Sequence, residues 1–118
     1  MSDAPGDVDW TDLTAFQREC LWAILELGRD GGRKGLEVKD WLDERFGEDI
    51  NHGRLYPNLD RLAELGLVEK GRIDDRTNSY EITGDGLELL SFETARARAI
   101  LEERSKPSGE VSLPGGQV

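Results

Sequence analysis

The chain has 118 residues and a formal net charge of −10, with 25 acidic residues against 15 basic ones, and this length is typical of a single domain with its own core. A single cysteine excludes an intrachain disulfide and a cysteine-based zinc site. No apolar run is long enough to cross a membrane and the N-terminus lacks a signal pattern, so we expect a cytoplasmic protein.

Residues 1–12 are acidic and rich in turn formers, which predicts an N-terminal arm with Trp10 as an anchor on the body. The first helix is predicted to follow a capping box of Thr14 and Gln17 and to end at Gly28. It is apolar on two faces, and such a helix is covered from both sides. In so small a domain, the simplest second cover is another subunit.

Residues 30–35 are predicted to be a loop, and residues 36–46 a second helix that ends at Gly47. The inward face of this helix is expected to carry Val38, Trp41, Leu42 and Phe46. Lys34 and the backbone donors at the helix start could hold a phosphate, because helix N-termini attract anions.

A third helix is predicted from a stripe of leucines on a 3.6-residue period, namely Leu55, Leu59 and Leu62. Asn51 is a suitable N-cap, and Gly66 stands where a glycine would end the helix. Pro57 removes one backbone donor, so we expect a bend or a loosened first turn.

The opposite face of this helix is predicted to carry Gly53, Arg54, Pro57, Asp60, Arg61 and Glu64. Near the helix start, His52 and Arg54 offer donors beside Gly53, which has no side chain. A backbone could approach DNA there, and an arginine could read guanine edges. On the charges alone, an ordinary solvated helix face is the better interpretation, but the segment that follows reverses this preference.

After Gly66 the period changes from 3.6 to 2, which predicts strands over residues 67–73 and 79–82 with a turn between them. Arg72 and Arg76 flank that turn. A helix that runs straight into a small hairpin with arginines at its tip is typical of the recognition helix and wing of a winged helix-turn-helix. The predicted fold is mainly α with a small β-hairpin (α+β), and residues 13–83 are its DNA-binding domain.

Thr83 is predicted to cap a last helix over residues 84–104. Its apolar positions follow a 3-4 spacing that suits pairing with another helix: Leu87, Leu90, Thr94, Ala97 and Leu101. A helix of roughly 20 residues is about 30 Å long and would overhang the body, so dimerisation is favoured over packing on its own domain. Residues 105–118 are predicted to be a flexible tail.

Three segments resemble the PadR-like family of transcriptional regulators: 53–59 (Gly-Arg-Leu-Tyr-Pro-Asn-Leu), 62–68 (Leu-Ala-Glu-Leu-Gly-Leu-Val) and 80–83 (Tyr-Glu-Ile-Thr). The resemblance covers about residues 13–104, and the acidic, arginine-rich composition looks like a member from a salt-loving archaeon. It implies a homodimeric, sequence-specific DNA-binding regulator that is adapted to high salt and responds to stress.

The residues expected to contact DNA are Lys34, Asn51, His52, Gly53, Arg54, Tyr56, Pro57, Arg61, Arg72, Arg76 and Asn78. Those expected at the dimer interface are Trp22, Leu25, Leu90, Ala97 and Leu101. Acidic residues near the reading surface would repel phosphate unless cations lie between them. Potassium ions bridging protein and DNA are therefore expected near Asp60, Glu64, Asp74 and Asp75.

Other chemistries find little support. His52 is the only histidine, and the glycine-rich stretches lack the residues of a phosphate loop, so we expect neither an enzyme nor a cofactor. Cys20 lies on an inward stripe, where a cysteine usually behaves as a small buried hydrophobe and not as a redox sensor. The net charge of −10 favours one alternative, a winged-helix module that binds protein and not DNA.

Overall fold

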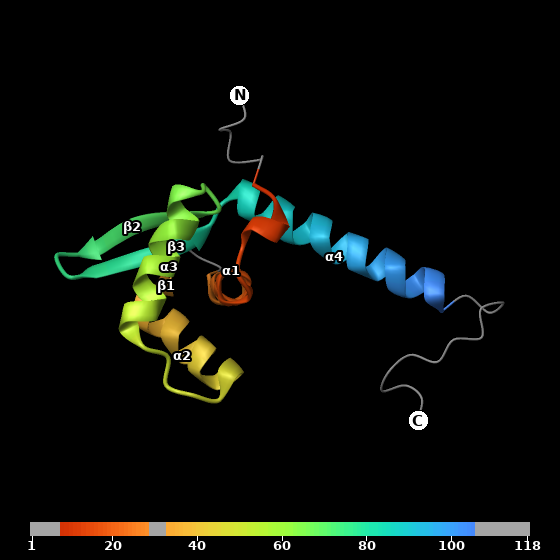
Figure 1. Ribbon diagram of the computed structural model, residues 1–118. Coiled ribbons are helices and arrows are strands. Elements are labelled where there is room, and N and C mark those ends of the chain that lie inside the picture. The colour runs from red at the N-terminus through yellow and green to blue at the C-terminus, as the bar shows by residue number, and fades with distance from the viewer. Residues whose placement is uncertain (1–7, 29–32, 106–118) are drawn as a thin grey trace.

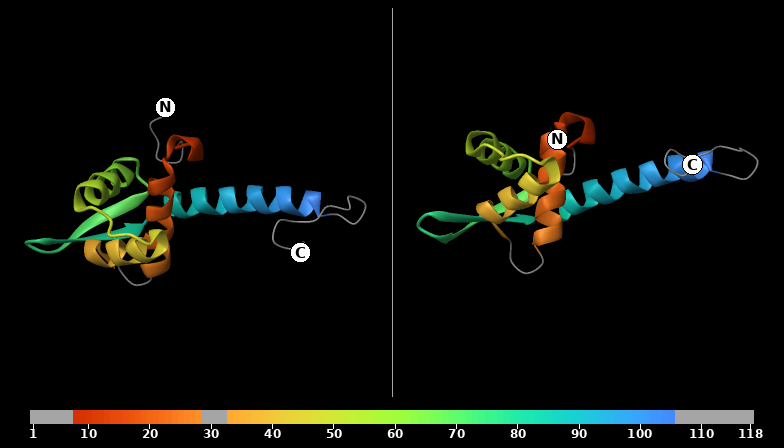
Figure 2. Two further views of the ribbon diagram at one scale, coloured as in Figure 1. Left: turned by 60° about the horizontal axis from the view of Figure 1, so that its bottom comes forward. Right: turned by 90° about the horizontal axis from the view of Figure 1, so that it is seen from below.

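The structure is a computed structural model that describes residues 8–28 and 33–105. Its elements follow in the order η2 (a 3-10 helix, Trp10–Asp12), α1 (Ala15–Leu27), β1 (Arg33–Lys34), α2 (Gly35–Phe46), α3 (His52–Glu64), β2 (Val68–Asp74), β3 (Thr77–Ile82) and α4 (Gly84–Arg104). Helices α1–α3 and the sheet form one body, and α4 projects from it (Figures 1 and 2). The α+β winged-helix fold is confirmed.

Side-chain caps explain where the helices begin. Gln17 and Thr14 form the expected capping box, with the Gln17 backbone N donating to Thr14 Oγ1 at 3.1 Å. The side chain of Asn51 accepts from the backbone N of Gly53, which begins α3. Pro57 lies inside α3 without ending it, and the chain leaves the helix through Gly66 at φ 79°.

The sheet differs from the predicted hairpin by one strand. Its order is β1-β3-β2 and all pairs are antiparallel, with Lys34 of β1 opposite Ser79 of β3. The prediction of a loop up to residue 35 is therefore wrong for Arg33 and Lys34, because two residues carry no alternation that a sequence could show. The wing strands reach closer to the tip than predicted, with an irregularity between Arg72 and Asp74.

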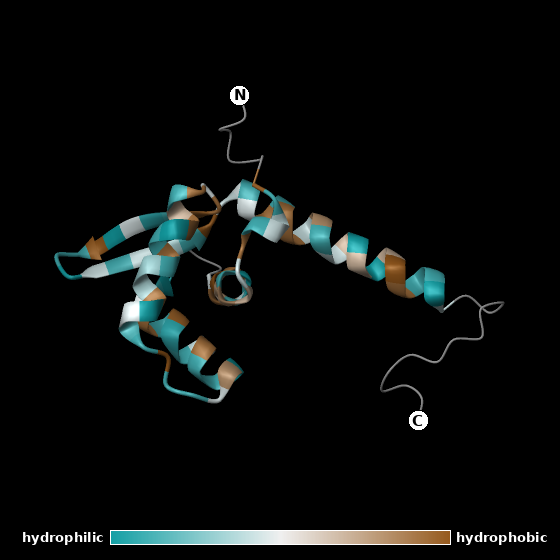
Figure 3. Cartoon of the chain, in the orientation of Figure 1, coloured by the Kyte–Doolittle hydropathy of each residue, from teal (hydrophilic) through white to brown (hydrophobic). Residues whose placement is uncertain are grey.

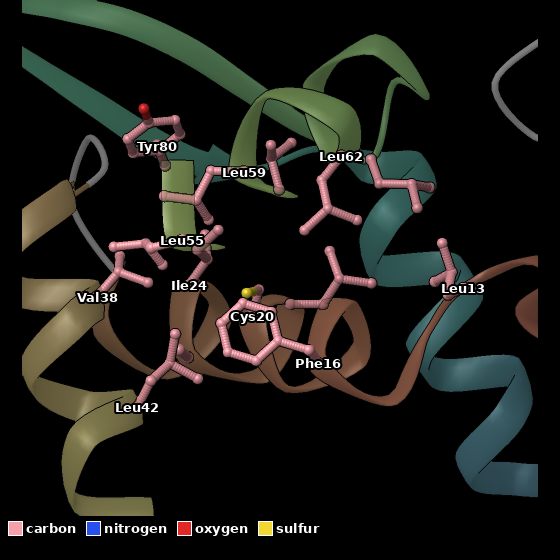
Figure 4. Packing of buried hydrophobic residues seen from close by; sticks show 14 of the residues in the cluster. Leu13, Phe16, Cys20, Ile24, Val38, Leu42, Leu55, Leu59, Leu62 and Tyr80 are labelled. Carbon is pink, nitrogen blue, oxygen red and sulfur yellow. The ribbon is translucent and has the colours of Figure 1, made fainter. Parts of the chain in front are cut away.

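The core lies between α1, α2, α3 and the sheet (Figure 4). Its fully buried side chains include the three leucines of the predicted stripe, Leu55, Leu59 and Leu62. Trp10 packs against this core, whereas residues 1–7 of the predicted arm lie outside the described residues. The prediction that Phe46 points inward is wrong, because this last residue of α2 is 39% exposed, although its ring lies 5.8 Å from that of Phe16 between centroids.

Helix α4 begins at its predicted cap, since Thr83 Oγ1 accepts from the backbone N of Gly86 at 3.0 Å. Only its first turns reach the body, and the rest extends into solvent (Figure 1). Brown, hydrophobic bands recur along it (Figure 3), and its exposed large apolar side chains are Leu87, Phe92, Ile100 and Leu101. From residue 106 the predicted tail lies outside the described residues. Within the described residues, no helix has the length and apolar character needed to cross a bilayer.

Candidate nucleic-acid interface

A cavity of about 420 Å³ opens where the starts of α2 and α3 meet the wing. Five of the residues expected to contact DNA line it together: Lys34, His52, Tyr56, Arg76 and Asn78. They come from three segments that are far apart in the chain. The fold thus concentrates one histidine, one lysine and one arginine around a single opening on an otherwise acidic molecule.

Two local features bring α2 and the wing to this cavity. Lys34 is at once the N-cap of α2 and the partner of Ser79 in the sheet. Gly35, the first residue of α2, lies so close to α3 that an added Cβ would stand 2.7 Å from Tyr56 Cε1. Glycine at this position therefore lets the Tyr56 ring lie directly on the start of α2. Gly35 was not among the residues predicted from the sequence, since nothing local distinguishes it from other loop glycines.

The exposed side of α3 carries the other predicted residues. The rings of His52 and Tyr56 lie 5.7 Å apart between their centroids, on the side that faces the cavity. Gly53, Pro57 and Arg61 are exposed. Gly53 also has a structural reason to be glycine, because a Cβ there would meet the capping oxygen of Asn51 at 2.9 Å.

Arg54 lies away from the cavity. Its guanidinium carbon stands 4.0 Å from the centroid of the Phe16 ring, which is a cation–π contact with α1. Its Nη1 is also 3.9 Å from a carboxylate oxygen of Glu48. The side chain is 48% exposed, so it can still reach solvent, but its contacts tie it to the body on the α1 side of α3.

The wing is joined to α3 by an ion pair that was not predicted from the sequence. Lys70 Nζ donates to Asp60 Oδ1 at 2.8 Å, and this bond raises the pKa of Lys70 above its ordinary value. At the tip, Asp74 accepts from the backbone N of Arg76, and this hydrogen bond lowers the pKa of Asp74.

Three of the four acidic residues expected near potassium ions already have partners within the chain. Besides the Asp60 and Asp74 contacts, Glu64 pairs with Arg61 at 3.2 Å. Asp75 is exposed in the turn of the wing. Among the residues that the structure describes, no group of three or more His, Cys, Asp or Glu side chains could hold a metal ion.

Cys20 is fully buried, and burial raises the pKa of its thiol to about 12 despite the nearby positive charge of Arg54. A thiol in this environment stays protonated at neutral pH and is a poor nucleophile. The geometry therefore supports a packing role for Cys20, as the sequence indicated.

A second groove, of about 460 Å³, runs between α1 and α4. Its lining includes three of the residues expected at a dimer interface: Trp22, Leu25 and Leu90. Leu90 is 1% exposed, so it belongs mainly to the core of its own chain and contributes little surface to the groove. Ala97 and Leu101 lie exposed farther along α4.

The model of the PadR-like family of transcriptional regulators matches residues 24–91, which is more than half of the chain. The chain belongs to this family. It is a transcriptional regulator of the winged-helix type, and membership of the family implies DNA binding. The matched segment contains α2, α3, both wing strands and the start of α4, so it includes every element around the cavity.

The chain is similar to regulators of Halobacterium salinarum. The structure is similar to a solved structure of RosR from H. salinarum, described as grown from NaBr. The two chains are 44% identical with a TM-score of 0.70, and the match covers 77% of this chain and 79% of that one. A second solved structure, described as the complex structure of hsRosR-S1, has a chain that is 39% identical to this one with a TM-score of 0.72, and the match covers 86% of both chains. The transcriptional activator GvpE2 of Halobacterium salinarum is 30% identical over 90 residues, 65% of this chain, and the match spans 47% of its own length.

A more distant structure, MarR, shares the fold at 22% identity and a TM-score of 0.57, over 83% of this chain and 69% of that one. At this identity the likeness concerns the fold alone. Together with the RosR structures, it agrees with the winged-helix architecture.

Proposed function

We propose that this protein is a sequence-specific DNA-binding regulator that acts as a homodimer in concentrated salt. The observation that carries the proposal is the cavity at the junction of α2, α3 and the wing, where Lys34, His52 and Arg76 meet. Phosphate contacts position a protein on a duplex, and donors at a helix start suit an anionic phosphate. The cavity therefore marks the edge of a surface that can hold a DNA strand.

In this arrangement α3 enters the major groove with its exposed first half. The side chains at its outer surface are His52, Tyr56, Pro57 and Arg61, with Gly53 allowing close approach. The wing then lies along the same strand, where Arg72 and Arg76 reach phosphates or a narrow minor groove. Replacing both wing arginines with alanine should weaken binding to all sequences more than it changes sequence preference.

A second copy of the chain would cover the groove between α1 and α4 and the exposed side of α4. Leu87 is 45% exposed and Leu101 53%, and burying such side chains against a partner is favourable. Leu101→Glu would place an unpaired charge in that contact and should raise the monomer fraction in sedimentation. Sedimentation of the unaltered chain as a monomer at micromolar concentration would overturn the dimer.

Salt adaptation follows from the acidic residues of the reading surface. At molar salt the Debye length is about 3 Å, so arginine–phosphate attraction is strongly screened. We infer that potassium ions bridge DNA phosphates to carboxylates among Asp60, Glu64, Asp74 and Asp75. Asp75 is the best placed, since Asp60 is held by Lys70, Glu64 by Arg61 and Asp74 by a backbone donor.

One binding experiment tests these statements together. Anisotropy titrations with genomic fragments, repeated from low to molar potassium chloride, should show selective binding whose affinity is flat or rises with salt over part of the range. Asp75→Asn should restore the ordinary loss of affinity with salt. No DNA binding at any salt concentration would favour the alternative suggested by the net charge of −10, a winged-helix module that binds protein. Mapping the genomic binding sites would then identify the regulated genes and any link to stress.

A further inference from the structure

A third cavity, of about 400 Å³, lies between α1 and α2 and shares no residue with the cavity that faces the wing. Its lining consists of Glu19, Trp22, Leu25, Glu26, Trp41 and Arg45. This volume is in the range of small-molecule sites, which are mostly apolar and aromatic with a few polar groups. Neither Trp22 nor Trp41 is fully buried, so the cavity is open to solvent.

The lining of the cavity holds two negative charges and one positive charge, those of Glu19, Glu26 and Arg45. Arg45 binds Glu19 through two hydrogen bonds, Nε to Oε1 at 3.0 Å and Nη2 to Oε2 at 3.3 Å, so these two charges offset each other. The Glu26 carboxylate accepts from the neutral indole N–H of Trp41 at 2.9 Å. In the described part of the chain, no cation pairs with Glu26. The cavity therefore combines two indoles with one negative charge that no lining residue neutralises.

We propose that this cavity binds a small organic monocation with a quaternary ammonium or aromatic head. Indole is the aromatic side chain that attracts cations most strongly, and the attraction grows when the cation is desolvated. Glu26 supplies the opposite charge, whereas it repels an anion of the same size. A neutral compound of similar shape gains only the apolar contacts.

The position of the cavity connects it to regulation, and this part rests on the proposed function. Trp22 and Leu25 line both this cavity and the groove between α1 and α4, where the second subunit would lie. At the other end of α2, Gly35 supports the Tyr56 ring of α3. A ligand in this cavity lies between α1 and α2 and would change how α2 packs against α1. Because α2 begins at Gly35, against Tyr56, such a change would also alter the position of α3.

The binding test uses the full chain without DNA, at one fixed potassium chloride concentration. Benzyltrimethylammonium is titrated by calorimetry and by tryptophan fluorescence, beside benzenesulfonate and benzyl alcohol. We expect saturable binding of the cation alone. Glu26→Gln keeps an oxygen for the Trp41 N–H but removes the charge, and should weaken cation binding about tenfold. Glu44→Gln is the control, because Glu44 is an exposed glutamate of α2, the other helix of the cavity, and lies outside the lining, so the variant should leave the affinity unchanged.

Equal binding of benzenesulfonate, or an unchanged affinity in a folded Glu26→Gln variant, would overturn the site. The DNA test then adds saturating benzyltrimethylammonium to a chain already bound to its operator. A shift in operator affinity that Glu26→Gln abolishes supports the coupling, and an unchanged affinity refutes it while the site stands. Cation binding is measured without DNA. A failure to bind DNA therefore overturns the proposed function but does not affect the evidence for the cation site.

Discussion

The joint between α4 and the body depends on one glycine, and its replacement provides a sharp test of the structure. A Cβ added at Gly86 would lie 2.2 Å from the backbone O of Leu67 and 2.9 Å from Cδ1 of Ile82. The Leu67 carbonyl cannot move aside easily, because it also accepts the backbone N of Thr83 at 3.1 Å. Gly86→Ala must therefore displace the first turn of α4.

The magnitude follows from two opposing effects. Alanine favours a helix over glycine by about 0.5–1 kcal/mol. Forcing a methyl group more than 1 Å inside ordinary contact distance of about 3.5 Å costs roughly 1–3 kcal/mol in a packed site. The difference between these effects is centred near a loss of about 1 kcal/mol in the free energy of unfolding for Gly86→Ala, which corresponds to a drop in Tm of roughly 5 °C.

Gly84→Ala is the matched control, since Gly84 lies two residues earlier in the same helix and an added Cβ meets nothing within 4 Å. It should be neutral or stabilising by about 0.5 kcal/mol. Both variants are unfolded with denaturant and by heating at equal protein concentration, because the proposed dimer would make Tm depend on concentration. If Gly86→Ala is as stable as Gly84→Ala, α4 does not lie on Leu67 as described.

Gly35→Ala should push the Tyr56 ring away from α2 at little cost in stability, because a side chain can move aside. The displaced ring should weaken DNA binding, and an unchanged affinity in anisotropy titrations would contradict a role of Gly35 in positioning Tyr56. Arg54→Ala should lower specific DNA binding by about 1–3 kcal/mol if the arginine leaves Phe16 to read a base, and equal discrimination between operator and random DNA would refute this. Cys20 binds its proton more tightly when folded, since burial raises the pKa of its thiol from 9.0 to about 12. The free energy of unfolding should therefore fall as pH rises above 9.0, by on the order of 1 kcal/mol near pH 10, and Cys20→Ala should lose this part of the slope.

Local patterns in the sequence were enough for the helices and the wing. Thr14, Asn51 and Thr83 begin their helices as predicted, because an N-cap bonds to a backbone N two or three residues away and needs nothing from the rest of the fold. The leucine stripe of α3 is buried as predicted, since a 3.6-residue period already specifies which face is apolar. The family resemblance rests on these same segments, and the family match confirms it.

Long-range contacts decided the rest. Strand β1 exists only because Arg33 and Lys34 meet Tyr80 and Ser79, nearly fifty residues later, and two residues carry no periodicity of their own. A helical wheel shows that Arg54 is outside the apolar stripe, but its stacking on Phe16 depends on where α1 crosses α3.

The candidate site shows the same division. The residue types around the cavity were identified from sequence, as donors at a helix start and at the tip of a hairpin. Their meeting at one opening depends on Gly35 admitting the Tyr56 ring and on Lys70 holding the wing to Asp60. Each of these contacts joins residues ten or more positions apart. The local sequence around either residue is compatible with many different partners. Only the packing of α2, α3 and the wing selects one of them.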